Sequence, residues 1–221
     1  MSLLLGDKIN SNKLEFGLDG GLNLSELSNV NGNLASRFNI GFYFDFKMKN
    51  PAWMFHTGVI VKSTMGIKDV PVYSLGDPSL DASFAGGSID RRLSYFNVPF
   101  MIKRQFRNNL FVEAGPMLAL MNNANDVFTK KVVNKDDLTY THDVRSLYHT
   151  FDAGMMGGIG YRLMGGQGMN LGVRYYLGLM DVLKDNTGPA QYNRSLYFYI
   201  GIPIGKGKAE KRAVEKEQGN K

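Results

Sequence analysis

The stretch Leu34–Lys62, LASRFNIGFYFDFKMKNPAWMFHTGVIVK, predicts one long β-hairpin. In its first arm every even position from Phe38 to Met48 is apolar, while the odd positions are polar, charged or glycine, with one tyrosine. A strict period of two over about twelve residues indicates a strand longer than most. Lys49–Ala52 forms a polar turn, and the second arm, Trp53–Lys62, again has an apolar and a mixed face.

Two fold classes are compatible with this hairpin. A tilted strand of ~9–11 residues crosses a bilayer, and membrane barrels alternate apolar residues outside with polar residues inside. A soluble sandwich or lipocalin-like barrel would instead bury the apolar face in its core. The hairpin alone leaves both open, so the remaining chain has to decide.

Composition narrows the choice. The chain has 221 residues and no cysteine, so it carries no disulfide framework and no thiol chemistry. No apolar run comes near 18 residues, which excludes a helical membrane protein. The formal net charge is +6, but the tail Gly205–Lys221 holds six Lys or Arg and three Glu and so supplies half of it. Because the positive charge is not one concentrated patch, nucleic acid is not an expected partner.

Six further alternating segments join the hairpin to give eight predicted strands. They are Lys13–Leu24, Arg92–Phe106, Leu110–Met121, Leu147–Met164, Met169–Leu183 and Arg194–Ile204. Short turns alternate with long polar connections, of which 66–91 and 122–146 are the longest. This sorting is typical of membrane barrels, which have short periplasmic turns and long outer loops. The prediction is an all-β protein, an eight-stranded antiparallel up-and-down transmembrane β-barrel over residues 13–204, with a leader (1–12) and a charged tail (205–221).

Several strands resemble those of one known family. Tyr95–Lys103, YFNVPFMIK, and the following Phe111–Pro116, FVEAGP, resemble consecutive strands of the PorT-like outer-membrane β-barrel family of Bacteroidetes. Arg174–Val182, RYYLGLMDV, and Gly20–Ser25, GGLNLS, are similar to two more of its strands. The resemblance covers roughly residues 13–204 and implies a bacterial outer-membrane location and an OmpA- or OmpX-like barrel. It implies no defined activity, and part of the family serves protein-secretion machinery.

The two ends of the chain depart from this pattern. Met1–Gly6 lacks the basic and long apolar regions of a secretory signal, so we expect Met1 to be a trimmed start close to that of the mature protein. Outer-membrane barrels commonly end on an aromatic residue of the last strand, whereas this chain continues past Ile204.

The polar face of the predicted strands carries the candidate site. An eight-stranded barrel has an interior just wide enough for its own side chains, and buried charges must be paired. We therefore expect a salt-bridged lumen, with a narrow path for water or small ions as the alternative. The predicted network comprises Glu15, Asp19, Arg37, Asp45, Lys47, Lys62, Lys103, Glu113, Asp152, Arg162 and Arg174.

Aromatic residues and prolines add two smaller expectations. Beside the short turns, the apolar face carries Phe46, Trp53, Phe106 and Tyr161, a candidate interfacial girdle. Pro99, Pro116 and Pro203 fall inside strands and cannot donate to a ladder, so bulges or gaps are expected there.

No catalytic, cofactor or metal site is predicted. His142 with Asp136, Asp137 and Asp143 matches no standard metal site. Ser146 and His149 would point to opposite faces of a strand, which argues against a lipid-modifying enzyme. The expected role is structural or interactive, with a plugged lumen and the outer loops as contact surface. A porin-like channel and a secretion component are the alternatives. Expected partners are outer-membrane lipid and other envelope proteins.

Overall fold

The computed structural model describes residues 13–132, 137–166, 168–185 and 188–204. Its strands are β1 (Leu14–Leu27), β2 (Asn33–Lys47), β3 (Trp53–Pro71), β4 (Ser88–Gln105), β5 (Leu110–Lys130), β6 (Leu138–Asp143), β7 (Phe151–Arg162), β8 (Asn170–Gly178) and β9 (Asn193–Pro203). The short helices are α2 (Pro78–Phe84), η1 (Arg145–Leu147) and α3 (Leu163–Gly166). The expected leader and charged tail lie outside the described residues.

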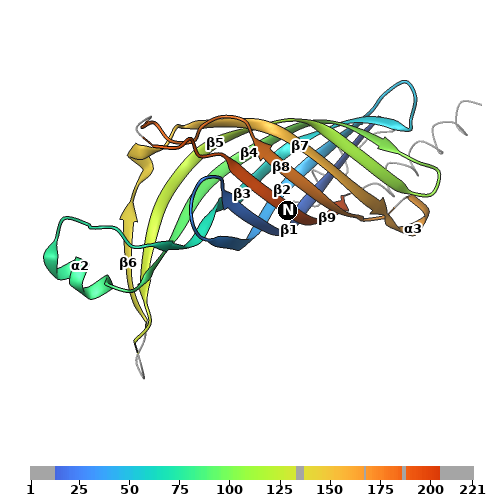
Figure 1. The fold of residues 1–221 in the computed structure, drawn as a ribbon. Helices are drawn as coiled ribbons and strands as arrows, with labels where there is room; N and C mark the ends of the chain where they lie inside the picture. The colour runs from blue at the N-terminus through green and yellow to red at the C-terminus, as the bar shows by residue number, and fades with distance from the viewer. Residues whose placement is uncertain (1–12, 133–136, 167, 186–187, 205–221) are drawn as a thin grey trace, which may run out of the picture.

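All these strands except β6 close into an eight-stranded antiparallel barrel. The sheet order is β4-β3-β2-β1-β9-β8-β7-β5-β6, and the additional pairing of β4 with β5 closes the ring (Figure 1). Each barrel strand thus pairs with the next barrel strand along the chain. β5 pairs with β7 because β6 lies outside the barrel, and β9 pairs with β1. The prediction of an eight-stranded up-and-down barrel is confirmed. Among the described residues, no helix is long and apolar enough to cross a membrane.

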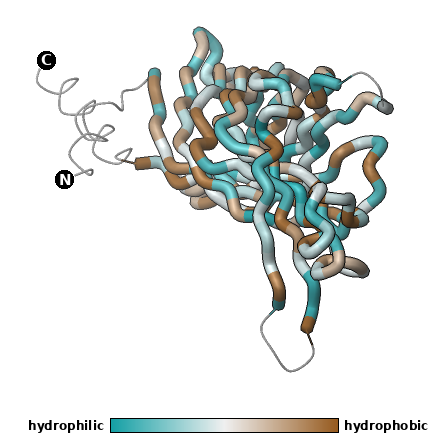
Figure 2. Tube along the Cα trace, turned by 90° about the vertical axis from the view of Figure 1, so that its left-hand side faces the viewer, coloured by the Kyte–Doolittle hydropathy of each residue, from teal (hydrophilic) through white to brown (hydrophobic). Residues whose placement is uncertain are grey.

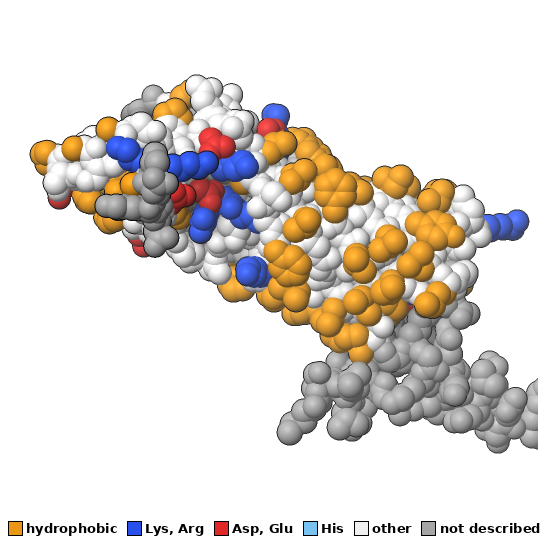
Figure 3. Space-filling view, turned by 90° about the horizontal axis from the view of Figure 1, so that it is seen from below, with side chains coloured by type: hydrophobic (Ala, Val, Ile, Leu, Met, Phe, Trp, Pro, Cys, Tyr) orange, Lys and Arg blue, Asp and Glu red, His pale blue; other side chains and the backbone are white. Residues whose placement is uncertain are grey.

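The faces of the strands follow the sequence alternation. In β2, Tyr43 and Asp45 are buried inside, whereas Phe38 and Phe46 point outward and are 51% and 42% exposed. The hydropathy of the chain accordingly changes from residue to residue along the strands (Figure 2). Large apolar side chains cover the outer wall of the barrel (Figure 3). In aqueous solution this apolar surface would be exposed to water. The barrel therefore requires a lipid environment.

The three short turns lie between β2 and β3, between β4 and β5, and between β7 and β8, as predicted. We call this end of the barrel the inner end and the opposite end the outer end. The first connection at the outer end is shorter than predicted. β1 continues to Leu27 and β2 begins at Asn33, because inward burial continues through Ser25 and Leu27.

The two long predicted loops are largely ordered structure, so that part of the prediction was wrong. Residues 66–91 contain the outer ends of β3 and β4 with α2 between them. Residues 122–146 contain the outer half of β5, then β6, which folds back onto β5, and η1. We call the described residues of 66–91 and 122–143 the outer extension. Figure 1 shows α2 and β6 projecting from one end of the barrel.

The ladder is irregular where the outer extension begins. β2 and β3 lose their pairing between Leu34 and Ile40, and β3 shifts against β4 between Ile60 and Ser63. The carbonyl oxygens of Thr64 and Gly66 instead accept hydrogen bonds from Asn23 and Ser25 on β1, at 3.0 and 3.1 Å. Side chains of β1 therefore replace the missing backbone partners of β3.

The expected effect of the strand prolines is found in part. Between β4 and β5, pairing is interrupted at Phe100 and Met101 and resumes at Ile102 in the same register. The interruption lies beside Pro99 and opposite Pro116, as a gap rather than a bulge. Pro203 is the last residue of β9, where a missing donor disturbs nothing further.

Candidate functional site in the barrel interior

The barrel interior brings together most of the charges that the sequence placed there. Glu15, Asp19, Asp45, Lys103, Glu113, Asp152, Arg162 and Arg174 are all buried, and each is at most 6% exposed. They come from six strands, β1, β2, β4, β5, β7 and β8, each of which contributes one or two of these inward charges. Apart from Asp152, they form ion pairs with one another.

Arg174 of β8 is the centre of the network. Its guanidinium donates to Glu113 of β5 at 2.6 Å and to Asp19 of β1 at 2.7 Å. The same group donates from Nη2 to Nε2 of His56 on β3 at 3.1 Å. Because a guanidinium only donates, His56 accepts at Nε2 and donates its Nδ1–H to Asp45, 2.6 Å away. Lys103 completes the row with a 3.1 Å bond to Asp45.

An aromatic ring fills the space around Arg174. The guanidinium carbon lies 3.7 Å from the centre of the Tyr199 ring, and the Tyr199 hydroxyl donates to Glu113 at 2.8 Å. The ring lies against Gly172, where a Cβ atom would come within 2.6 Å of it. Glycine at this inward position therefore makes room for the ring. Together, the side chains that bond to Arg174 reach across the lumen.

A second ion pair closes the lumen nearer the inner end. Arg162 of β7 donates to both carboxylate oxygens of Glu15 on β1 at 2.5 Å. The Tyr43 hydroxyl also donates to Glu15, at 3.2 Å. The pair is almost fully shielded from solvent, with side chains 3% and 5% exposed.

Three predicted members of the network lie elsewhere. Lys62 is exposed on the outer wall, because the irregularity of β3 between Ile60 and Ser63 turns both Val61 and Lys62 outward. Lys47 is also exposed, since it is the last residue of β2 and lies at the open inner end. Arg37 pairs with Asp90 at the outer end. For these three residues the expectation of a lumen role was wrong.

Asp152 differs from the other interior acids, because no cation pairs with it among the described residues. Its carboxylate accepts from the amide of Asn193 at 2.8 Å, and that amide also donates to the Tyr95 hydroxyl at 3.0 Å. Asp152 is therefore held by neutral groups.

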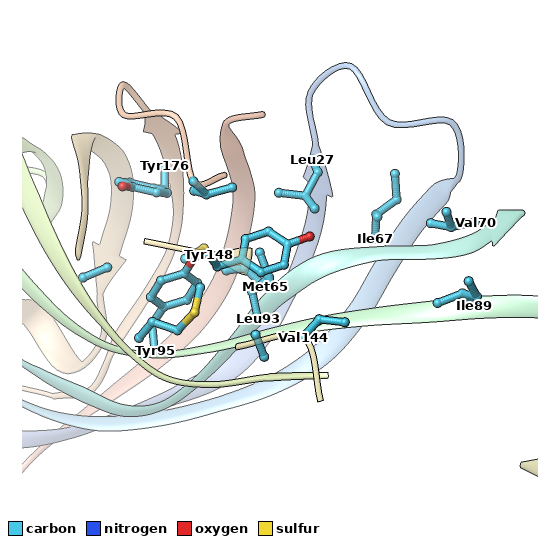
Figure 4. Close-up of a cluster of buried hydrophobic side chains, with 14 of the residues drawn as sticks. Leu27, Met65, Ile67, Val70, Ile89, Leu93, Tyr95, Val144, Tyr148 and Tyr176 are labelled. Atoms are coloured by element: carbon cyan, nitrogen blue, oxygen red, sulfur yellow. The ribbon is translucent and has the colours of Figure 1, made fainter. Parts of the chain in front are cut away.

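The outer half of the lumen holds a large apolar cluster that the sequence analysis does not predict, with buried polar side chains such as Asn97 and Asn193 hydrogen-bonded to its tyrosines. Buried methionines, tyrosines and aliphatic side chains from β1, β3, β4, β5, β7, β8 and β9, and from the connection between β6 and β7, pack against each other there (Figure 4). Its central members include Met65, Leu93, Tyr95, Met117, Tyr148 and Met156. A signal was available, because Met65, Met101, Met117, Met121 and Met156 all lie on the inward-facing side of their strands.

The four predicted girdle residues all point outward near the inner end. Phe46, Trp53, Phe106 and Tyr161 are 37–42% exposed. The Arg104 guanidinium lies 5.1 Å from the Trp53 ring centre and 5.2 Å from that of Phe106. An arginine between two outward aromatic rings fits a membrane–water boundary.

The apolar cluster of the outer lumen continues into the outer extension. α2 packs on β5 through Phe84 and Phe128, whose ring centres lie 5.8 Å apart, and Tyr73 packs on Phe128 at 5.2 Å. The Tyr73 hydroxyl donates to Asp126 at 3.0 Å, and Arg91 bonds the same carboxylate at 2.7 and 2.8 Å. Burial, with the neighbouring Asp126 carboxylate, raises the pKa of Tyr73 well above its ordinary value. A pocket of about 210 Å³ remains between α2 and Phe128.

The part of the chain that the structure describes contains no arrangement of side chains suited to metal binding or catalysis. No group of three or more His, Asp or Glu side chains there is arranged to hold a metal ion. His142 lies on β6 and contacts the Tyr73 hydroxyl at 3.1 Å, whereas Asp136 lies outside the described residues. Ser146 belongs to η1, and both Ser146 and His149 are exposed.

The fold, the apolar wall and the paired interior charges define a bacterial outer-membrane β-barrel. The model of the family described as "Outer membrane protein beta-barrel domain" matches residues 7–184, and the chain belongs to this family. A search of curated protein sequences finds no match. The finer resemblance to PorT-like barrels stays a prediction.

Solved structures of outer-membrane proteins are similar to the chain. The attachment invasion locus protein Ail of Yersinia pestis, in complex with the heparin analogue sucrose octasulfate, is 9% identical with a TM-score of 0.45, and the match covers 86% of this chain and 99% of Ail. Neisserial surface protein A is 13% identical with a TM-score of 0.43, covering 87% and 96%. These values are too low to carry a function from either protein to this chain.

Proposed function

We propose that this protein is a closed outer-membrane barrel whose role is to present the outer extension to partners outside the cell. The observation that carries the proposal is the filled interior. Charged side chains meet across the lumen at the level of Arg174. Between there and the outer end, an apolar cluster fills it together with hydrogen-bonded polar side chains such as Ser63, Asn97 and Asn193. In the part of the chain that the structure describes, these side chains block the lumen at both levels, so we seek the function on the surface of the barrel.

The outer extension supplies such a surface. It displays exposed Tyr73, Val132, Leu138 and Tyr140, each 37–41% exposed. β6 is the last strand of the sheet order, so one of its edges has no strand partner among the described residues. Apolar side chains beside a free strand edge favour contact with another protein. Other envelope proteins, including secretion machinery, belong to the same proposal as candidate partners.

A photo-crosslinking experiment on intact cells tests this role. A photoreactive phenylalanine analogue replaces Tyr140 on β6 in one variant and Asn31, in the short first outer connection, in a control variant. We expect a discrete protein adduct at position 140 and none at position 31. Absence of an adduct at position 140, in a variant that inserts into the membrane normally, would overturn the contact role. A conducting lumen would instead favour the narrow channel.

A further inference from the structure

A pocket opens on the outer wall of the barrel, away from the lumen and from the outer extension. It has a volume of about 270 Å³ and lies across β2, β1, β9 and β8. Its apolar lining consists of Leu24, Leu34, Leu196 and the ring of Tyr175, and its charged lining consists of Glu26 and Arg194. Leu24, Leu196 and Tyr175 are register partners on three adjacent strands, and Glu26 is the partner of Arg194. The pocket therefore has an apolar row on the inner side and a charged row on the outer side.

The level of the pocket coincides with the edge of the membrane. A strand rises about 3.3 Å per residue and tilts by about 40°, so the ten residues from Leu14, the register partner of the girdle residue Phe46, to Leu24 climb roughly 25 Å along the barrel axis. That distance equals the height of the apolar band of such barrels, which is ~25 Å. Glu26 and Arg194 consequently lie where lipid headgroups begin, and Leu24 and Leu196 lie where acyl chains begin.

The two charges of the pocket do not satisfy each other. Their nearest atoms, Nη1 of Arg194 and Oε1 of Glu26, are 4.0 Å apart, beyond hydrogen-bond distance. Nε of Arg194 is buried and has no hydrogen-bond partner among the described residues. Both side chains are more than 40% exposed toward the outside. The arginine is thus positioned to donate to an anion and the glutamate to accept from a hydroxyl group.

We propose that this pocket binds one phosphorylated glycolipid of the outer leaflet. An acyl chain lies against Leu24, Leu34 and Leu196, a phosphate accepts hydrogen bonds from Arg194, and a sugar hydroxyl donates to Glu26. A lipid fits better than a protein partner, because the pocket is continuous with the lipid-facing wall. A sugar-bearing lipid with a phosphomonoester fits better than a phosphodiester lipid, because the monoester offers Arg194 more negative charge and one more accepting oxygen, and the sugar hydroxyls can donate to Glu26.

Binding to the folded, detergent-solubilised protein, followed by native mass spectrometry, tests the proposal. The probes are a diphosphorylated, acylated glucosamine disaccharide, its dephosphorylated form, and phosphatidylglycerol. The wild type is expected to retain one copy of the first probe and to bind the other two at least about tenfold more weakly, the loss expected for a charge-assisted hydrogen bond. Equal binding of the dephosphorylated form, or of phosphatidylglycerol, would overturn the assignment.

Variants then locate the site. Arg194→Gln is expected to weaken binding about tenfold, and Glu26→Gln by a few-fold, through the loss of these bonds. Leu34→Trp keeps both charges and blocks the apolar part, so it too should lose the lipid. The matched control is Lys62→Gln, another exposed outward cation, which lies on β3 and does not line the pocket. Unchanged lipid binding by Arg194→Gln, or an equal loss of binding in Lys62→Gln, would contradict this location of the site.

Discussion

The two halves of the lumen are filled by different kinds of interaction. Toward the inner end, Arg174, Arg162 and Lys103 are locked to carboxylates by ion pairs. Toward the outer end, methionine, tyrosine and aliphatic side chains pack together (Figure 4). In the charged half each group depends on a particular partner, whereas in the apolar half neighbours share the contacts. Substitutions should therefore be severe and specific in the first half and graded by volume in the second.

Removal of the central cation should have the largest effect. Arg174→Gln leaves Asp19 and Glu113 buried without their cation, which should lower the free energy of unfolding by about 3–5 kcal/mol. Urea unfolding in lipid vesicles measures this, with the fluorescence of the single tryptophan, Trp53, as reporter. Arg107→Gln in the exposed inner turn is the control and should change stability by less than about 0.5 kcal/mol. If the free energy of unfolding of Arg174→Gln falls by less than about 1 kcal/mol, the ion-pair network does not stabilise the barrel.

Two interior aspartates sharpen the comparison. Asp45→Asn takes the carboxylate from Lys103 and should cost about 3 kcal/mol, because it strands a buried cation. Asp152→Asn strands no cation and should cost no more than about 1 kcal/mol. The same unfolding assay compares them directly, and equal losses would mean that pairing with a cation is not what distinguishes these positions.

The apolar half should respond to volume alone. Met117 is fully buried, so Met117→Ala should cost about 2–3 kcal/mol through lost contacts and a cavity. Met117→Leu nearly conserves the volume and should cost less than about 1.5 kcal/mol. Similar losses for both variants, measured by the same urea titration, would indicate a specific role for the thioether.

The smallest predicted effect is local and acid-dependent. Hydrogen bonds from the Ser79 hydroxyl and from the backbone N–H groups of Ser79 and Leu80 lower the pKa of Asp77, the N-cap of α2. A lowered pKa means that the cap contributes fully above the ordinary value of 3.8 and is lost as the pH falls through the folded-state value.

Hydrogen-exchange protection of the Ser79 and Leu80 amides should therefore fall in acid. In Asp77→Asn, whose neutral side chain still caps a helix, the protection should lose this pH dependence. Acid-sensitive protection that persists in Asp77→Asn would assign the effect to another group.

The barrel fold can be predicted because it is determined by local features of the sequence. Alternation in Leu34–Lys62 sets the faces, and the turn at Lys49–Ala52 sets the direction of the next strand. The interior positions of Asp45, Glu113 and Arg174 follow from the same parity. A parity argument fails once a strand slips by one residue, which is why Lys62 was assigned to the wrong face.

Other features depend on contacts between distant segments. The pairing of Arg174 with Asp19 joins strands 155 residues apart, and sequence spacing does not specify which acid an arginine selects. The sequence predicts loops in the outer extension because polar residues and glycines interrupt the alternation there. The strands form because β4, β5 and β6 pair with one another. The apolar cluster of the outer half is not predicted by the alternation, because an inward methionine or tyrosine on a strand looks the same in sequence whether its neighbours are charged or apolar.

Single-channel recording in planar bilayers tests the closed lumen most directly. The preparation is first checked by electrophoresis with and without heating, in which a mobility shift reports a folded barrel. The account predicts that the folded protein inserts without producing conductance steps above the background of the bilayer. Regular, reproducible steps from such a preparation would mean that water and ions pass Arg174 and the apolar cluster, and the closed-lumen account would be wrong.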